Sequence, residues 1–210
     1  MEVDAGTRVA QLADELRALA TNGMRYADNG YDTDRYERVL RAAAELTSLV
    51  DRRSATEIER VYRGDLGVRT PLAAADAAIF DEVGRMLLVQ RADSGDWCMP
   101  GGAAEVGESP SAAAVREAYE ETGLRVRARR VLGVYDNRSA GYGRGARHIY
   151  HLVFLCEVVG GELVRVTIET TDAGWFAEPE TEKLPLFRSH AMKIPTAFRL
   201  HTTGGHADFH

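Results

Sequence analysis

The sequence of 210 residues contains few cysteines, few lysines and no long apolar run. Cys98 and Cys156 are the only cysteines, so nothing indicates a disulfide framework or a cysteine-rich zinc site. No apolar stretch approaches the roughly 20 residues that a membrane-spanning helix needs. The acidic N-terminal stretch MEVDAGTR is also unlike a secretory signal peptide. These absences predict a cytoplasmic protein without a membrane partner.

The positive charge is almost entirely arginine, since Lys183 and Lys193 are the only lysines. The formal net charge is -6 at pH 7. This acidic balance argues against a general nucleic-acid-binding surface, although it leaves room for a local basic patch.

Hydrophobic periodicity divides the chain into two regions. Residues 1–67 have a helical pattern. They predict one helix that Gly23 ends, a second that begins near residues 32–34, and a short third that Ser54 and Glu57 open with a capping box. After Pro71 the apolar runs become short and strand-like, at residues 73–80, 86–90, 127–136, 148–158 and 174–177. We therefore predict a helical N-terminal module, residues 1–67, and an α+β domain, residues 72–210, with a C-terminal helix and tail.

The segment 102–124 combines helix signals with an unusual row of carboxylates. Ser109 and Pro110 are typical of a helix start, and Gly123 is typical of a helix end. Three glutamates between them share one helix face: Glu117, Glu120 and Glu121. Like charges at this spacing repel each other. The ordinary alternative is an acidic helix face that is solvated and binds nothing. A cluster of oxygen ligands instead suits a hard divalent cation, above all Mg²⁺.

Seven residues of this segment have the identities and spacing of the Nudix box: Gly102, Glu108, Arg116, Glu117, Glu120, Glu121 and Gly123. Such a match should arise by chance on the order of once in 10^8 windows. Residues 72–185 therefore resemble the Nudix hydrolases, which implies an α/β/α sandwich with a mixed sheet. The stretch around Tyr26 and Tyr36 resembles the helical module of bacterial Nudix enzymes that act on nucleoside diphosphates linked to another group, such as the CDP-choline and ADP-ribose pyrophosphatases.

The resemblance implies hydrolysis of a pyrophosphate linkage, giving a nucleoside monophosphate and a phosphorylated product. It implies Mg²⁺, with Mn²⁺ as an alternative, held by these groups: Glu117, Glu120, Glu121 and the backbone carbonyl of Gly101. Arg116 would complete the catalytic set by holding the glutamates through charge-assisted hydrogen bonds. The structural residues of the motif would be Gly102, Glu108 and Gly123. The general base would be a box glutamate or a residue of a distant loop, with Glu169 and Asp172 as candidates.

Substrate recognition has weaker signals. A nucleobase needs an aromatic face and a few directed polar groups. The candidates near the right elements are Trp97, Tyr135, Arg138, Arg147 and Tyr150. The glycine-rich stretch 137–147 is compatible with a loop that closes over the site and equally with a hairpin connection.

Two alternatives belong to other functional classes: an RNA-end processing enzyme, which the acidic charge disfavours, and a nucleotide sensor without activity, which the intact carboxylates disfavour. The helical module is small for an independent core. We therefore expect a homodimer in which this module packs on the partner's catalytic domain.

Overall fold

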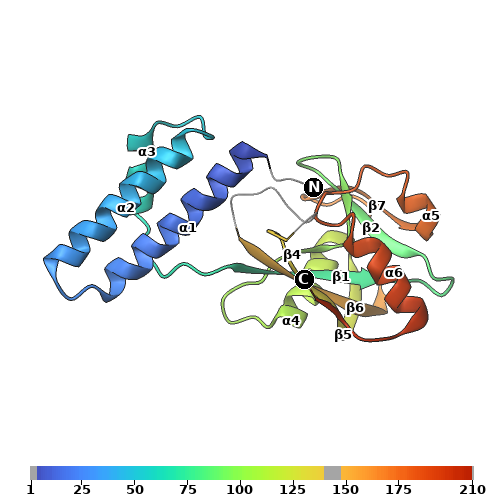
Figure 1. Ribbon diagram of the computed structural model, residues 1–210. Coiled ribbons are helices and arrows are strands. Elements are labelled where there is room, and N and C mark those ends of the chain that lie inside the picture. Colours follow the sequence, from blue (N-terminus) through green and yellow to red (C-terminus); the bar gives the residue numbers. More distant parts are fainter. Residues whose placement is uncertain (1–3, 140–147, 210) are drawn as a thin grey trace. The chain divides into compact units, whose positions relative to one another are not determined.

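The computed structural model describes residues 4–139 and 148–209 (Figure 1). The chain forms two compact units that divide between Pro71 and Leu72, with His148 grouped with the first unit. This division lies where the helical periodicity of the sequence gives way to strand-like runs. No helix in the described ranges has the length and apolar character required to span a bilayer.

Three helices make up the first unit: α1 (Ala5–Tyr26), α2 (Gly30–Ser48) and α3 (Ala55–Arg63). Their shared core contains these buried residues: Ala20, Leu40, Ala43, Ala44, Ile58 and Tyr62. The helix α3 begins with the predicted capping box between Ser54 and Glu57. The prediction that Gly23 ends the first helix is wrong, because α1 continues to Tyr26. A Cβ atom on Gly23 would lie 2.3 Å from the Tyr36 ring, so this glycine permits close packing of α1 against α2.

The second unit contains two sheets. One has the strand order β4-β1-β6-β5-β8 and the other β3-β2-β7. Strand β1 pairs with β6 in parallel and with β4 antiparallel, so the larger sheet is mixed. The strands are β1 (Leu72–Ile79), β2 (Met86–Arg91), β3 (Trp97–Cys98), β4 (Gly101–Ala103), β5 (Leu124–Asp136), β6 (Ile149–Gly161), β7 (Thr170–Phe176) and β8 (Asp208–Phe209). The helices are α4 (Pro110–Thr122), α5 (Glu178–Thr181) and α6 (Lys193–Thr203).

Helices cover both faces of the larger sheet. Side chains alternate between the faces along β1: Ala75 and Ala77 pack in the cluster that includes α4, whereas Ala78 packs in the cluster that includes α6. Phe154 and Val153 of β6 divide between the two clusters in the same way. The predicted α/β/α sandwich with a mixed sheet, preceded by a helical domain, is confirmed.

Candidate active site

Helix α4 has the predicted boundaries. The Ser109 side chain accepts a hydrogen bond from the backbone N–H of Ala112, and Pro110 occupies the first turn. Gly123 has φ of 70° and donates its N–H to the Tyr119 carbonyl, closing the helix. A positive φ is strained for residues with a Cβ atom, which explains glycine at this position.

Arg116 connects the α4 glutamates to the loop before the helix. Its guanidinium donates to Glu108 at 3.0 and 3.1 Å, and to Glu117 and Glu120 at 2.9 Å each. It also donates to the carbonyl oxygen of Ala103 in β4 at 3.1 Å. The planar fork of arginine suits such simultaneous contacts. Arg116 therefore offsets the charge of three carboxylates and fixes where their side chains lie.

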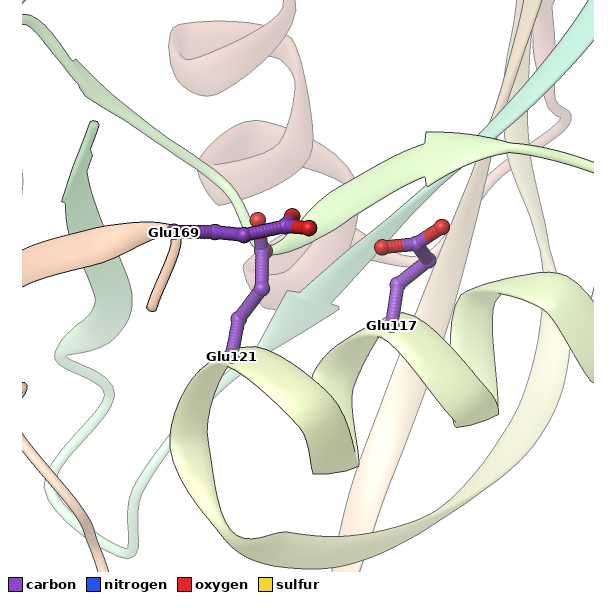
Figure 2. Close-up of side chains that lie close together, drawn as sticks. All are labelled: Glu117, Glu121 and Glu169. Atoms are coloured by element: carbon purple, nitrogen blue, oxygen red, sulfur yellow. The ribbon is translucent and has the colours of Figure 1, made fainter. Parts of the chain in front are cut away.

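Glu117, Glu121 and Glu169 converge at one point (Figure 2). Glu117 and Glu121 extend from α4, and Glu169 comes from the loop that leads into β7. One carboxylate oxygen from each lies within 4.8 Å of the others. Glu117 and Glu121 are both 8% exposed, whereas Glu169 is exposed. A group of three carboxylates at this separation is a candidate site for a divalent cation.

The electrostatic cost of the cluster falls mainly on Glu121. Burial raises its pKa to about 8, the nearby charges of Glu117 and Glu169 act in the same direction, and the N–H of Gly101, at 2.9 Å, opposes them. Burial also raises the pKa of Glu117, although Arg116 counteracts this. Among the described residues, neither Glu121 nor Glu169 has a salt-bridge partner. A cation at the cluster would lower these pKa values, because an opposite charge favours the ionised form.

Strand β4 runs close to these carboxylates. A Cβ atom on Gly102 would lie 2.5 Å from a carboxylate oxygen of Glu117, so only glycine allows this approach. The neighbouring Gly101 donates its N–H to Glu121. The two glycines thus place the β4 backbone directly against the acidic cluster.

Two other candidates lie outside the convergence point. Glu120 contacts Arg116, and its side chain is 55% exposed. Asp172 forms a bidentate ion pair with Arg165, at 2.7 and 3.0 Å. This pairing lowers the pKa of Asp172. Of the two base candidates, the structure brings only Glu169 to the α4 carboxylates.

A cavity of about 290 Å³ adjoins the cluster. Its walls are formed by Glu120, Glu121, Thr167, Ile168 and Glu169. Ile168 is almost fully exposed at this position. The cavity therefore combines carboxylates with one large apolar side chain that is available to a ligand.

The structure places two of the substrate-binding candidates in the core. Tyr135 is 1% exposed and belongs to the core beside α6. Trp97 is also buried in this core, and its ring packs edge-on against Phe176. Tyr150 lies on β6 and is partly exposed. The half-buried Arg138 lies two residues after the end of β5.

Arg147 and most of the glycine-rich stretch 137–147 lie outside the described residues. The loop closure and the arginine contact that the sequence suggests therefore stay predictions.

The fold and the acidic helix are those of a Nudix domain. The family profile of the NUDIX domain matches residues 70–195. A second profile, described as the UDP-X-like, N-terminal oligomerisation domain, matches residues 7–62. The chain therefore belongs to the Nudix hydrolase family, and the resemblance seen in the sequence is confirmed.

Similar proteins include a Bacillus subtilis protein named "Putative ADP-ribose pyrophosphatase YjhB", which is 30% identical over 192 residues and covers 91% of each chain. A solved ADP-ribose pyrophosphatase from Streptococcus suis has a TM-score of 0.58 and 29% identity, over 67% of this chain and 100% of that one. A UDP-X diphosphatase structure has a TM-score of 0.62 over 98% of this chain and 99% of that one, at 21% identity. This last likeness, at 21% identity, shows the fold alone.

Proposed function

We propose that the protein is a Mg²⁺-dependent pyrophosphohydrolase of nucleoside diphosphates linked to another group, with ADP-ribose as the first substrate to test. The convergence of Glu117, Glu121 and Glu169 beside a cavity carries this proposal. The names of the relatives from Bacillus subtilis and Streptococcus suis support the choice of ADP-ribose. UDP-linked and CDP-linked compounds, including CDP-choline, are the related candidates.

The donor set fits a hard cation. The groups at the site are carboxylate oxygens together with the β4 backbone, which is the chemistry that Mg²⁺ and Mn²⁺ accept. Cys98 is unsuitable as a ligand, because burial raises the pKa of its thiol to about 12 and only a thiolate binds metal well. We assign Glu117, Glu120, Glu121 and the Gly101 carbonyl as the groups that hold the ions. Bound divalent cations would supply charge neutralisation of the diphosphate and a more acidic water.

Glu169 and Arg116 have the two other roles in the proposed reaction, as the general base and as the residue that positions the glutamates. We assign Glu169 as the general base, because it is exposed, faces the cavity and has no described ion-pair partner. It takes a proton from the attacking water while a new bond forms between the water oxygen and one phosphorus. The bond from that phosphorus to the bridging oxygen breaks, and the second phosphate leaves with the bridging oxygen. Arg116 keeps the glutamates in place throughout.

We also propose that the protein forms a homodimer through the helical unit. The matched profile of this unit is described as an oligomerisation domain. Large side chains remain exposed on it, including Tyr26 at 77% and Tyr31 at 83%. Light scattering of the full chain at micromolar concentration should give twice the mass of 23.1 kDa. A monomeric mass would contradict this assignment.

The central experiment offers the purified protein Mg²⁺ and a substrate panel: ADP-ribose, a UDP-sugar, CDP-choline, nucleoside triphosphates and a short RNA. We expect conversion of ADP-ribose to AMP and ribose 5-phosphate. Glu117→Gln should abolish it, and Glu15→Gln should leave it unchanged, because Glu15 is an exposed residue of α1. Turnover of RNA alone would favour an RNA-end processing enzyme, and binding without turnover would favour a sensor.

Glu169→Gln separates the roles of base and ligand. If Glu169 is the base, kcat falls strongly and Mn²⁺ binds with nearly unchanged affinity. Weakened Mn²⁺ binding would instead make Glu169 a metal ligand and overturn the assignment.

A further inference from the structure

A buried group of charged and polar side chains lies next to β4, around Asp76 of the neighbouring strand β1. The proposed hydrolysis mechanism gives this group no role. Asp76 of β1 is 2% exposed and Lys193 of α6 is 1% exposed. The Lys193 Nζ atom donates to Asp76 Oδ2 at 2.7 Å. His190 places Nε2 3.8 Å from Asp76 Oδ1, and His151 places Nδ1 3.5 Å from Asp76 Oδ2.

The fold explains why these residues meet. Asp76 shares the face of β1 that Ala78 presents to α6, because side chains alternate along the strand. His151 and Val153 occupy the corresponding face of β6. His190 lies three residues before Lys193, at the approach to α6, and donates its N–H to the Phe187 carbonyl. The group is therefore built from two strands and the segment leading into α6.

His190 connects this group to the strand that borders the acidic cluster. Its Nδ1 atom accepts the backbone N–H of Met99 at 3.1 Å. The next residue, Pro100, accepts a hydrogen bond from the Ala77 N–H at 2.8 Å. Gly101 follows, pairs with Asp76 across the strands and donates its N–H to Glu121. The segment Met99–Gly101, which leads to the proposed metal site, is thus held by the His190 side chain and by hydrogen bonds to β1.

The hydrogen bond from Met99 requires a particular tautomer of His190. A nitrogen that accepts a hydrogen bond carries no proton, so the proton of a neutral ring must be on Nε2. In this tautomer the protonated nitrogen, Nε2, is the one that lies 3.8 Å from Asp76 Oδ1, so the carboxylate attracts it electrostatically without a direct hydrogen bond. Burial, followed by the charge of Lys193, holds the pKa of His190 well below its usual value, so the ring is neutral.

We propose that Lys193, Asp76 and His190 form a positioning relay that fixes the segment Met99–Gly101 and so sets the β4 backbone against Glu121 at the metal site. This inference rests on the proposed function and deepens it. The Lys193 ammonium holds Asp76, the Asp76 carboxylate selects the tautomer of His190, and His190 holds Met99. Outer partners that orient ligands in this way are common around metal sites.

A role in stability alone would account poorly for this arrangement. A buried ion pair brings little net stability, because the desolvation of both charges offsets their attraction. A well-packed apolar pair in its place is often equally stable. What an apolar pair could not do is select the proton position on His190 and leave Nδ1 free to accept from Met99.

The first test is made on the wild-type protein and uses one substitution only to assign the signal. Long-range proton–nitrogen NMR of the nitrogen-labelled wild-type protein reports which ring nitrogen of each histidine carries the proton, and the signal that disappears in His190→Asn identifies His190. We expect a neutral ring protonated on Nε2. A ring protonated on Nδ1, or on both nitrogens, would overturn the proposal even if every other variant failed to fold.

The second test measures Mn²⁺ binding by electron paramagnetic resonance, with thermal melting as the check on folding. His190→Leu should weaken Mn²⁺ binding about tenfold and reduce kcat by about 10–100-fold, with little change in KM. His190→Asn keeps an acceptor near the Nδ1 position and should recover most of both losses. Equal Mn²⁺ affinity in wild type and a folded His190→Leu protein would refute the relay.

A double variant tests the two charged members. Asp76→Asn combined with Lys193→Met removes both buried charges, so neither is left unpaired. We expect Mn²⁺ binding to stay several-fold weaker than in wild type in a protein that melts normally. Wild-type affinity in this variant would overturn the relay as stated. Failure of the proposed function is a separate result, because it would appear in the wild-type protein as a lack of Mn²⁺ binding or turnover.

Discussion

Glu121 has a large electrostatic cost in the metal-free protein, and Glu121→Gln should therefore stabilise the fold while removing activity. The folded-state pKa of about 8 compares with an ordinary glutamate pKa of 4.5. At pH 7 the carboxyl is mostly protonated when folded, whereas in the unfolded chain it is ionised. Between the unfolded-state pKa of 4.5 and pH 7, this difference in protonation lowers the free energy of unfolding by about 3 kcal/mol. Gln has the same shape, still accepts the Gly101 N–H and is free of this penalty.

The sign of the pH dependence follows from the raised pKa. The folded protein binds more protons than the unfolded chain between pH 4.5 and about 8, so its stability falls as the pH rises through this window. The difference between Glu121→Gln and wild type should therefore be near zero at pH 4.5 and reach about 3 kcal/mol at pH 7. For a chain of this size, that is about 6–12 °C in Tm.

The assay is thermal or denaturant unfolding in the presence of a chelator, at pH 4.5, 6 and 7. Glu120→Gln is the matched control, since its side chain is 55% exposed and loses only a surface ion pair worth up to about 1 kcal/mol. Added Mg²⁺ should reverse the ranking by stabilising the wild type more than Glu121→Gln. A metal-free Glu121→Gln protein that is no more stable than wild type at pH 7 would refute the reasoning.

Three further substitutions have expected outcomes. Arg116→Lys replaces the fork that contacts Glu108 and two other glutamates by a single ammonium, and we expect steady-state kinetics to show a kcat lower by about 10–100-fold; an unchanged kcat would contradict the positioning role. Gly23→Ala brings a Cβ atom to 2.3 Å from Tyr36 and should cost about 1–3 kcal/mol in urea unfolding; no loss would mean that the ring moves aside without cost. Ser54→Ala removes the side-chain acceptor of the α3 capping box and should cost about 1 kcal/mol, whereas a wild-type urea midpoint would contradict a stabilising cap.

Local signals predicted the helix that carries the site. The serine, proline and glycine at the ends of α4 act within a few residues, so their effects can be read from the sequence. The short strands β3, β4 and β8 could not be predicted in this way, because two or three residues are too few for a periodic pattern. They exist because neighbouring strands offer hydrogen-bond partners. Tertiary contacts also explain Gly23, which the local sequence predicted to be a helix end. It lies within α1, where it packs against Tyr36.

Long-range pairing accounts for the site residues that the sequence placed less well. Glu169 reaches the α4 carboxylates because β7 pairs with β2, and no local spacing reports that pairing. Asp76 offered a usable signal, as the one charged residue within the apolar run LAAADAAI. A charge in a strand that is buried on both faces needs a partner. The sequence could not reveal that this partner is Lys193, far along the chain.

The two sides of α4 differ in how their carboxylates are paired. Arg116 forms ion pairs with Glu108, Glu117 and Glu120. Its positive charge therefore offsets the carboxylates on the side of α4 that faces the preceding loop. Glu121 and Glu169 line the cavity, where no described side chain pairs with either. Glu121 is mostly protonated at pH 7, but an arriving divalent cation would displace this proton and bind the carboxylate, whereas a bare diphosphate finds no cationic partner on this side. This polarity predicts that nucleotide binds well only after the metal, and calorimetric titration of ADP-ribose with and without Mg²⁺ would measure that order directly.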